Sequence, residues 1–187
     1  MSGRYEAVVI GASAGGVEAL SVILPFIPET FSLPIVVVVH VPPDRRSIMA
    51  DLFRAKCILS VTEAEDKQPL VGGTIYFAPP DYHLLIETEG SLALSNEEPI
   101  LFSRPSIDVL FESAADAYGS RLIAIVLTGA NTDGAKGLRA VVDAGGTAIV
   151  QNPYGATAAA MPMAAISMVP EAHILQLTAI HEFLGKI

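Results

Sequence analysis

The sequence predicts an α/β protein with a doubly wound, mostly parallel sheet and an antiparallel hairpin insertion. Continuous apolar runs rich in valine and isoleucine recur along the chain, and such runs are typical of strands buried in a parallel sheet. Helical patterns separate these runs, and this alternation favours a doubly wound fold. The 187 residues, 51% of them hydrophobic, can bury one substantial core, so we expect a single domain over residues 1–187.

The strands of the main sheet are predicted from runs of branched apolar residues. They are expected at residues 7–10 (AVVI), 35–40 (IVVVVH), 122–127 (LIAIVL) and 147–151 (TAIVQ). Helical spacing of apolar residues predicts helices at residues 16–24, 47–56, 107–118 and 135–144. The last of these helices leads into Gly145 and Gly146, which are typical of a helix end.

The middle of the chain has a different pattern. Short apolar runs lie at residues 72–78, 84–87 and 92–95. The turn sequences PPDYH and TEGS join them. Short strands connected by tight turns pair in an antiparallel way, so we assign all three runs to the hairpin insertion.

Composition limits the classes of partner and compartment. The formal net charge of -9 argues against an electrostatic grip on nucleic acid or on anionic lipid. The single cysteine, Cys57, cannot form an internal disulfide and does not make a metal knuckle. No apolar run reaches the roughly 18 residues that a membrane helix needs, and no basic segment or cleavage site follows Met1. We therefore expect a cytoplasmic protein without membrane insertion, nucleic-acid partner or bound metal.

The stretch VVIGASAGGVEAL, residues 8–20, begins as a strand and ends as a helix. Read as G-x-S-x-G, its Gly11, Ser13 and Gly15 match the nucleophile elbow, a sharp turn that exposes a serine oxygen above the sheet. A dinucleotide-binding turn has glycine where this chain has Ser13, so that the backbone can approach a pyrophosphate. The turn by itself leaves a nucleophile, a phosphate cradle and a purely structural turn open.

Three polar residues are expected at the carboxyl ends of strands, where ligands gather in open α/β sheets. Ser13 follows the first strand, His40 closes the second, and Asp133 lies between a strand and a helix. A serine nucleophile needs an imidazole to take its proton, and the imidazole needs a carboxylate to fix its tautomer. Taken singly, His40 fits a structural role and Asp133 fits a helix cap. Taken together, the three residues favour an acyl-transfer site.

Further candidates surround this triad. His83 in APPDYH and Arg104 in SRPSIDVLF carry side chains that could contact substrate, and the backbone amides around Ala14 and Ala130 could stabilise an oxyanion. The alternatives are that His83 is an exposed turn residue and that Arg104 pairs with an acid at a helix start capped by Ser106.

Nearly the whole chain resembles one family, the catalytic domain of the chemotaxis protein-glutamate methylesterases, called CheB. The resemblance is carried by IGASAGG, VHVPP, TEAEDKQPLVGGTIYFAPPDYHL, RPSIDVLFESAA, VLTGANTDGAKGL, AGGTAIVQNP and AMPMAAI, in the family's order. It implies hydrolysis of glutamyl methyl esters on chemoreceptors, with glutamine deamidation as a second activity. By position, it implies that Ser13 is the nucleophile, His40 the base and Asp133 the orienting acid, with Ala14 and Ala130 at the oxyanion amides.

The resemblance also implies partners and shows departures. The partners would be the cytoplasmic helices of methyl-accepting chemoreceptors, together with a receiver domain or chain that this sequence does not contain, and no cofactor would be required. Val39 and Val41 replace the glutamine and the methionine or leucine that usually flank the histidine, and Ala130 and Asn131 replace Met and Gly in the aspartate loop.

Two rival functions remain open from the sequence. The first is a methylesterase-like module that has lost turnover and only binds signalling partners. The second is a nucleotide-binding domain that uses residues 11–16 as a phosphate cradle. Such a domain usually carries an acid for the ribose about 20 residues past the glycines, and the segment LPIVVVVHV offers none.

Overall fold

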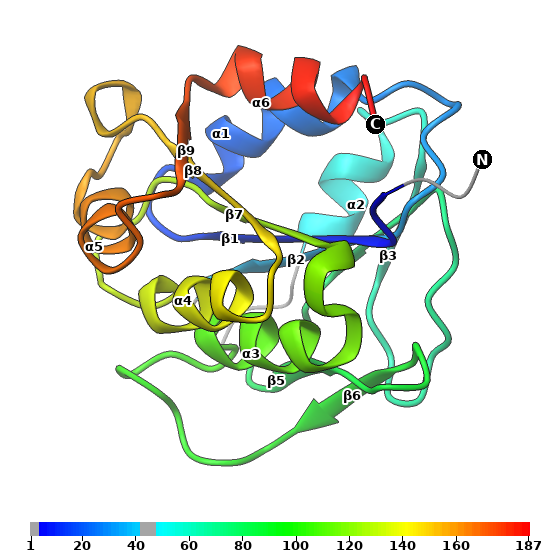
Figure 1. Cartoon of the computed structure of the whole chain (residues 1–187). Coiled ribbons are helices and arrows are strands. Elements are labelled where there is room, and N and C mark those ends of the chain that lie inside the picture. Colours follow the sequence, from blue (N-terminus) through cyan, green and yellow to red (C-terminus); the bar gives the residue numbers. More distant parts are fainter. Residues whose placement is uncertain (1–3, 42–47) are drawn as a thin grey trace.

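The computed structural model describes residues 4–41 and 48–187 as a layered α/β fold (Figure 1). Its main sheet is parallel and has the strand order β3-β4-β2-β1-β7-β8-β9. The strands are β1 (Ala7–Ala12), β2 (Ile35–Val39), β3 (Ser60–Glu63), β4 (Thr74–Phe77), β7 (Leu122–Val126), β8 (Thr147–Gln151) and β9 (His173–Leu175). A separate antiparallel pair contains β5 (His83–Ile86) and β6 (Leu92–Ser95).

Helices cover both faces of the main sheet, which confirms the predicted doubly wound class. Three helices pack with one buried apolar cluster: α1 (Gly16–Ile23), α2 (Met49–Arg54) and α6 (Leu177–Leu184). The opposite cluster contains the β5-β6 pair and three other helices: α3 (Ile107–Tyr118), α4 (Ala135–Asp143) and α5 (Ala160–Met168). Short 3-10 turns lie at Leu24–Phe26, Gly119–Arg121 and Pro153–Gly155.

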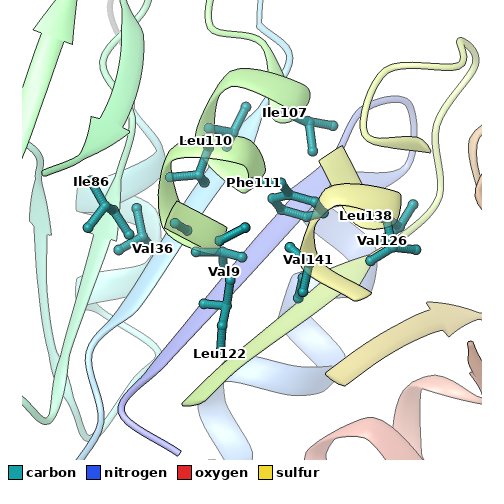
Figure 2. Close-up of a cluster of buried hydrophobic side chains, with 14 of the residues drawn as sticks. Val9, Val36, Ile86, Ile107, Leu110, Phe111, Leu122, Val126, Leu138 and Val141 are labelled. Carbon is teal, nitrogen blue, oxygen red and sulfur yellow. The ribbon is translucent and has the colours of Figure 1, made fainter. Parts of the chain in front are cut away.

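The core explains why the central strands are continuous apolar runs. All residues of β1, β2 and β7 are buried, because each strand carries side chains to a helical layer on both faces. Figure 2 shows side chains of α3 and α4 pointing toward those of β1 and β7. Phe111 of α3 is fully buried there, and truncation of such a side chain to alanine typically costs about 3–5 kcal/mol.

The register of the central strands positions the site. Ala12 of β1 lies beside Val39 of β2, and Gly11 lies beside Val126 of β7. The three strands therefore end at the same edge of the sheet. The residues that follow them, including Ser13 and His40, emerge side by side at that edge.

The predicted insertion is wrong for one of its three runs. Residues 84–87 and 92–95 supply the antiparallel β5-β6 pair, but residues 72–78 supply β4, which pairs in parallel with β2 and β3. The reason is burial, because Ile75, Tyr76 and Phe77 all fill core positions of the main sheet. A run of that kind belongs to a central layer and not to a half-exposed hairpin.

Other boundaries shift and several short elements are additional. The strand predicted at 7–10 extends to Ala12, and the helix predicted at 47–56 is observed as α2; Ser47 lies outside the described residues. The sequence did not predict β3, β9, α5 or α6. In the described part of the chain, no helix has the length and apolar character required to cross a membrane.

Candidate active site

A cavity of about 360 Å³ opens at the carboxyl edge of the sheet. Ser13, His40 and Asn131 line it near the ends of the central strands, and Pro99 and residues 102–105 of the loop after β6 also line it. The described residues place no group of three or more histidine, cysteine, aspartate or glutamate side chains where they could hold a metal ion. The polar side chains that line the cavity are those of Ser13, His40, Asp81, Ser103, Arg104 and Asn131.

Ser13 lies in the turn between β1 and α1. Its amide donates to Thr128 O at 2.9 Å, and its carbonyl accepts from the amide of Gly16 at 2.8 Å. Gly15 makes the turn sharp. Its φ of 81° is a backbone angle that residues with a side chain rarely adopt, and a Cβ at this position would lie 2.5 Å from Thr157 Cβ. The turn leaves the Ser13 side chain half-buried at the cavity, as a nucleophile elbow requires.

His40 continues from β2 and is oriented by a buried carboxylate. Its amide donates to Ala12 O at 3.1 Å, which ties it to β1. Its Nε2 lies 2.8 Å from Asp133 Oδ2. Because an ionised carboxylate only accepts hydrogen bonds, Nε2 carries the proton and Nδ1 keeps its lone pair. The side chain of His40 is 11% exposed, so Nδ1 can serve the cavity.

Asp133 is completely buried and accepts four hydrogen bonds. Oδ2 accepts from His40 and from the amide of Ile107 at 2.6 Å, while Oδ1 accepts from the Ser106 hydroxyl and from the amide of Asp108, each at 2.9 Å. Burial alone would raise the pKa of Asp133, but the hydrogen bonds from His40, Asp108 and Ile107 outweigh it and lower the pKa. The carboxylate is thus held ionised beside the imidazole.

Helices α3 and α4 exchange their N-terminal caps: an aspartate at the start of each helix binds the first amides of the other. Asp133, in the loop before α4, binds the first amides of α3, and Asp108, in the first turn of α3, binds the amides of Gly134 and Gly137 at 2.9 and 2.7 Å. Both carboxylates therefore satisfy amides that a helix start leaves unpaired. Burial raises the pKa of Asp108 to about 6, and the charge of Asp133 adds to the shift.

These caps differ from the predicted ones. Ser106 is the N-cap residue of α3, but its hydroxyl donates to Asp133 and makes no cap hydrogen bond. Asp133 caps α3, whereas the alternative considered from the sequence was a cap on the helix that follows it. The sequence could not reveal this exchange because the partners lie more than twenty residues apart along the chain.

His83 lies in the buried layer behind the cavity. It is 2% exposed and is not among the residues that line the cavity. Its Nδ1 accepts from the amide of Ser106 at 3.1 Å, and its Nε2 lies 2.9 Å from Glu98 O. His83 is therefore not the exposed turn residue considered as an alternative; it holds the residue that in turn contacts Asp133. A direct contact of His83 with substrate stays a prediction.

Arg104 lines the cavity and is paired with Asp81. Its Nη2 lies 2.6 Å from Asp81 Oδ1, and its Nη1 donates to the carbonyls of Asn96 and Glu97 at 3.0 and 3.1 Å. The guanidinium therefore fastens the loop that follows β6 to the wall of the cavity. The positive charge of Arg104 is partly offset by Asp81, and its predicted contact with substrate stays a prediction.

Ala14 and Ala130 were predicted to supply the oxyanion amides. Both residues are exposed at the carboxyl ends of β1 and β7, and neither amide donates a hydrogen bond within the described residues. Thr128 fixes the backbone between them, because its hydroxyl lies 2.9 Å from Ala14 O and its amide donates to Gln151 Oε1 at 2.8 Å. Their role as oxyanion donors stays a prediction.

Three residues that support the site were not predicted from the sequence, namely Asp108, Thr128 and Gln151. Ser106 was considered only as a helix cap, and Asn131 was noted only as a departure from the family's pattern. Asn131 Oδ1 accepts from the amide of Asp133 at 3.1 Å, which turns its Nδ2 to within 3.5 Å of His40 Nδ1. The available signal was a polar residue closing an apolar strand, as Gln151 does in TAIVQ. No hydrogen bond joins Ser13 Oγ to His40 in the described structure, although both side chains line one cavity.

Comparisons with known proteins agree on one family. Residues 8–184 match the family model of CheB methylesterase. A Leptospira interrogans protein named as a protein-glutamate methylesterase/protein-glutamine glutaminase is 45% identical over 184 residues, which cover 98% of this chain and 95% of that protein. The crystal structure of the Thermotoga maritima CheB methylesterase catalytic domain is 35% identical, with a TM-score of 0.92 over 97% of this chain and 98% of that one.

Some relatives are longer. A Rhodospirillum rubrum protein-glutamate methylesterase/protein-glutamine glutaminase is 39% identical over 85% of this chain but over 42% of its own length. A Carboxydothermus hydrogenoformans relative of the same name is 38% identical over 54% of its length. The chain therefore spans about half of these proteins.

Proposed function

The chain belongs to the CheB methylesterase family, and we propose that it hydrolyses glutamyl methyl esters of chemoreceptors through Ser13, His40 and Asp133. The family makes it a carboxylic ester hydrolase of chemotaxis. The observation that carries the residue assignment is the 2.8 Å contact between His40 Nε2 and the buried Asp133, in a cavity that His40 shares with Ser13. These are the three roles that acyl transfer to a serine needs.

Acylation begins when His40 Nδ1 accepts the proton of Ser13 Oγ as the oxygen attacks the ester carbonyl carbon. The charge on His40 is stabilised by Asp133, which stays ionised. The carbonyl oxygen becomes negative, and the amides of Ala14 and Ala130 are available to donate to it. When the bond between the acyl carbon and the methoxy oxygen breaks, the imidazolium gives its proton to that oxygen, and methanol leaves.

Deacylation repeats the same steps with water. His40 Nδ1 takes a proton from water, the hydroxide attacks the acyl carbon, and Ser13 leaves with the proton from His40. The products are an unesterified glutamate side chain, still part of the receptor, and the resting enzyme. A glutamine side chain can follow the same route with ammonia as the leaving group, which is the glutaminase activity in the names of the relatives.

The partners we propose are the cytoplasmic helices of methyl-accepting chemoreceptors, with Arg104 on the substrate side of the cavity and His83 acting through Ser106, which it holds beside Asp133. We further propose that the 187 residues act as one catalytic domain, with any receiver domain in another segment or chain. The near-complete match to the Leptospira interrogans protein supports this, and the longer relatives leave room for a second domain.

The direct test is methanol release from a receptor segment that carries glutamyl methyl esters. Ser13→Ala and His40→Ala should each abolish release, and the double variant should be no worse, because members of a triad work as a unit. Circular dichroism and thermal unfolding check that the variants are folded. Full activity of Ser13→Ala would refute the assignment of the nucleophile.

A further inference from the structure

A hairpin tip stands at the mouth of the Ser13 cavity. Ile100 and Ser103 pair across it: the amide of Ile100 donates to Ser103 O at 3.0 Å, and the amide of Ser103 donates to Ile100 O at 2.8 Å. The two residues between them, Leu101 and Phe102, have φ angles of 48° and 64°. In Figure 1 the loop after β6 that leads back to α3 projects at the same end of the molecule as the carboxyl edge of the sheet.

Leucine and phenylalanine are unfavourable residues for an exposed turn of this conformation. A two-residue hairpin loop with positive φ at both positions strongly favours Asn-Gly or Asp-Gly, because bulky L-residues are strained there. Phe102 is also fully exposed to solvent and Leu101 is half-exposed. Leucine and phenylalanine therefore oppose both the backbone conformation and the solvation of the tip. Strained positions of this kind cluster at ligand-binding sites.

The tip lies between two cavities. Phe102 lines the Ser13 cavity, together with Pro99 and Ser103. Leu101 lines a second cavity of about 590 Å³, which also contacts Lys136 and the partly exposed Met168. Because Leu101 and Phe102 are adjacent, an apolar ridge joins the mouths of both cavities.

The size of the Ser13 cavity decides what can enter it. A helix with its side chains is about 10–12 Å wide and rises about 5.4 Å per turn, so one turn fills roughly 400–600 Å³. The cavity holds about 360 Å³, which accommodates a glutamyl ester side chain but not the helix that carries it. A glutamyl side chain is short, so the substrate helix must lie across the mouth, against the hairpin tip.

We propose that Leu101 and Phe102 form the docking ridge for the substrate helix and distinguish a protein-bound ester from a free one. The occupant is the chemoreceptor helix itself, and its side chains one turn away from the esterified glutamate would contact the ridge. This inference rests on the proposed function and adds the part of the site that selects a macromolecular substrate.

The test uses variants that keep the turn while removing its side chains. Leu101→Asn/Phe102→Gly supplies the sequence that the backbone prefers, so its thermal midpoint should equal or exceed that of the wild type. Phe102→Ala tests the larger side chain alone. Phe26→Ala is the matched control, because Phe26 is also an exposed phenylalanine but lines neither cavity.

Two readouts are needed. The first is kcat/KM on a methylated receptor segment compared with that on N-acetyl glutamyl methyl ester amide. We expect both tip variants to reduce kcat/KM on the receptor segment at least tenfold more than kcat/KM on the small ester. Phe26→Ala should leave the ratio of the two kcat/KM values unchanged. The second readout is the Kd of the receptor segment in a Ser13→Ala background, where no turnover occurs; it should rise at least tenfold in the tip variants.

The outcomes separate this inference from the proposed function. Equal losses on both esters, or an unchanged Kd, would overturn the docking ridge, whatever the wild type hydrolyses. A wild-type chain that cleaves neither ester would contradict the proposed function, while the Kd measurement would still decide on the ridge.

Discussion

Two regions beside the Ser13 cavity differ in burial and in polarity. A floor of buried polar residues supports His40, and a rim of partly or fully exposed residues, some of them apolar, stands at the mouth of the cavity. The floor, defined here as Ser106, Asp108 and Asp133, is a buried layer that does not itself line the cavity. Its hydroxyl and carboxyl groups bind His40, one another and amides at the starts of α3 and α4. The rim, defined as Arg104 and residues 100–103, is at least partly exposed and includes two strained apolar residues. The contrast is consistent with our proposal that the floor fixes the chemistry and the rim selects the substrate.

Substitution of Asp133 in the floor should have the largest effect on activity. Asp133→Asn should lower kcat by about 10⁴-fold, because the amide cannot hold His40 in the tautomer that leaves Nδ1 basic. It should also cost about 1–3 kcal/mol of stability, because Nδ2 then faces the His40 or Ile107 donor. Both are measured by methanol release and by denaturant unfolding.

Asp108→Asn is the matched control for that change. The substitution is chemically the same and also affects a helix cap, but Asp108 does not contact His40. It should therefore lower kcat by less than about tenfold. Similar losses for both variants would mean that helix capping, and not orientation of His40, explains the effect of Asp133.

On the rim, Arg104→Ala should reduce kcat/KM on a receptor segment about tenfold more than on a small methyl ester. The reason is that Arg104 binds the carbonyls of Asn96 and Glu97 and so holds the loop after β6 at the cavity wall, where we propose that the receptor helix lies. Arg104→Lys keeps the charge but loses the forked hydrogen bonds, so it should resemble the alanine variant. Equal losses on the two substrates would instead assign Arg104 to the catalytic or structural core.

The smallest expected effect concerns the charge on the floor. The folded-state pKa of Asp108 is raised to about 6, so its ionisation removes stability as the pH rises through about 6. Asparagine still accepts through Oδ1 from Gly134 and Gly137 but carries no charge. The thermal midpoint of Asp108→Asn relative to wild type should therefore rise by on the order of 2–5 °C between pH 5 and pH 7.5. A difference that stays constant with pH would show that Asp108 does not titrate in this range.

The same contrast explains what could be predicted from sequence. The central strands were predictable because burial on both faces leaves continuous apolar runs, and those strands place Ser13 and His40 at one edge. By contrast, β9 has only three residues, two of them exposed, and gives no periodic signal. The β4 run was assigned to the wrong sheet because the apolar pattern of a short segment does not determine which strand it pairs with.

The supporting residues of the site were less accessible to sequence reasoning. Asp133 was predicted by its position after a strand, but the caps that bury it join two helices whose contact is set by tertiary packing. His83 gave no signal of burial, since it follows a turn sequence rich in proline and polar residues. The strain at Leu101 and Phe102 could not be read from the sequence, because it depends on a pairing of Ile100 with Ser103.

Labelling by a fluorophosphonate reports an activated serine without any receptor, so it tests the assignment of Ser13 as nucleophile. We expect one label per chain by intact mass, located on Ser13 by peptide mapping. Ser13→Ala should take up none, and His40→Ala should react far more slowly than wild type. An unlabelled wild-type chain would refute the assignment and favour a methylesterase-like module that binds without turnover, and a label on another residue would refute Ser13 as the nucleophile.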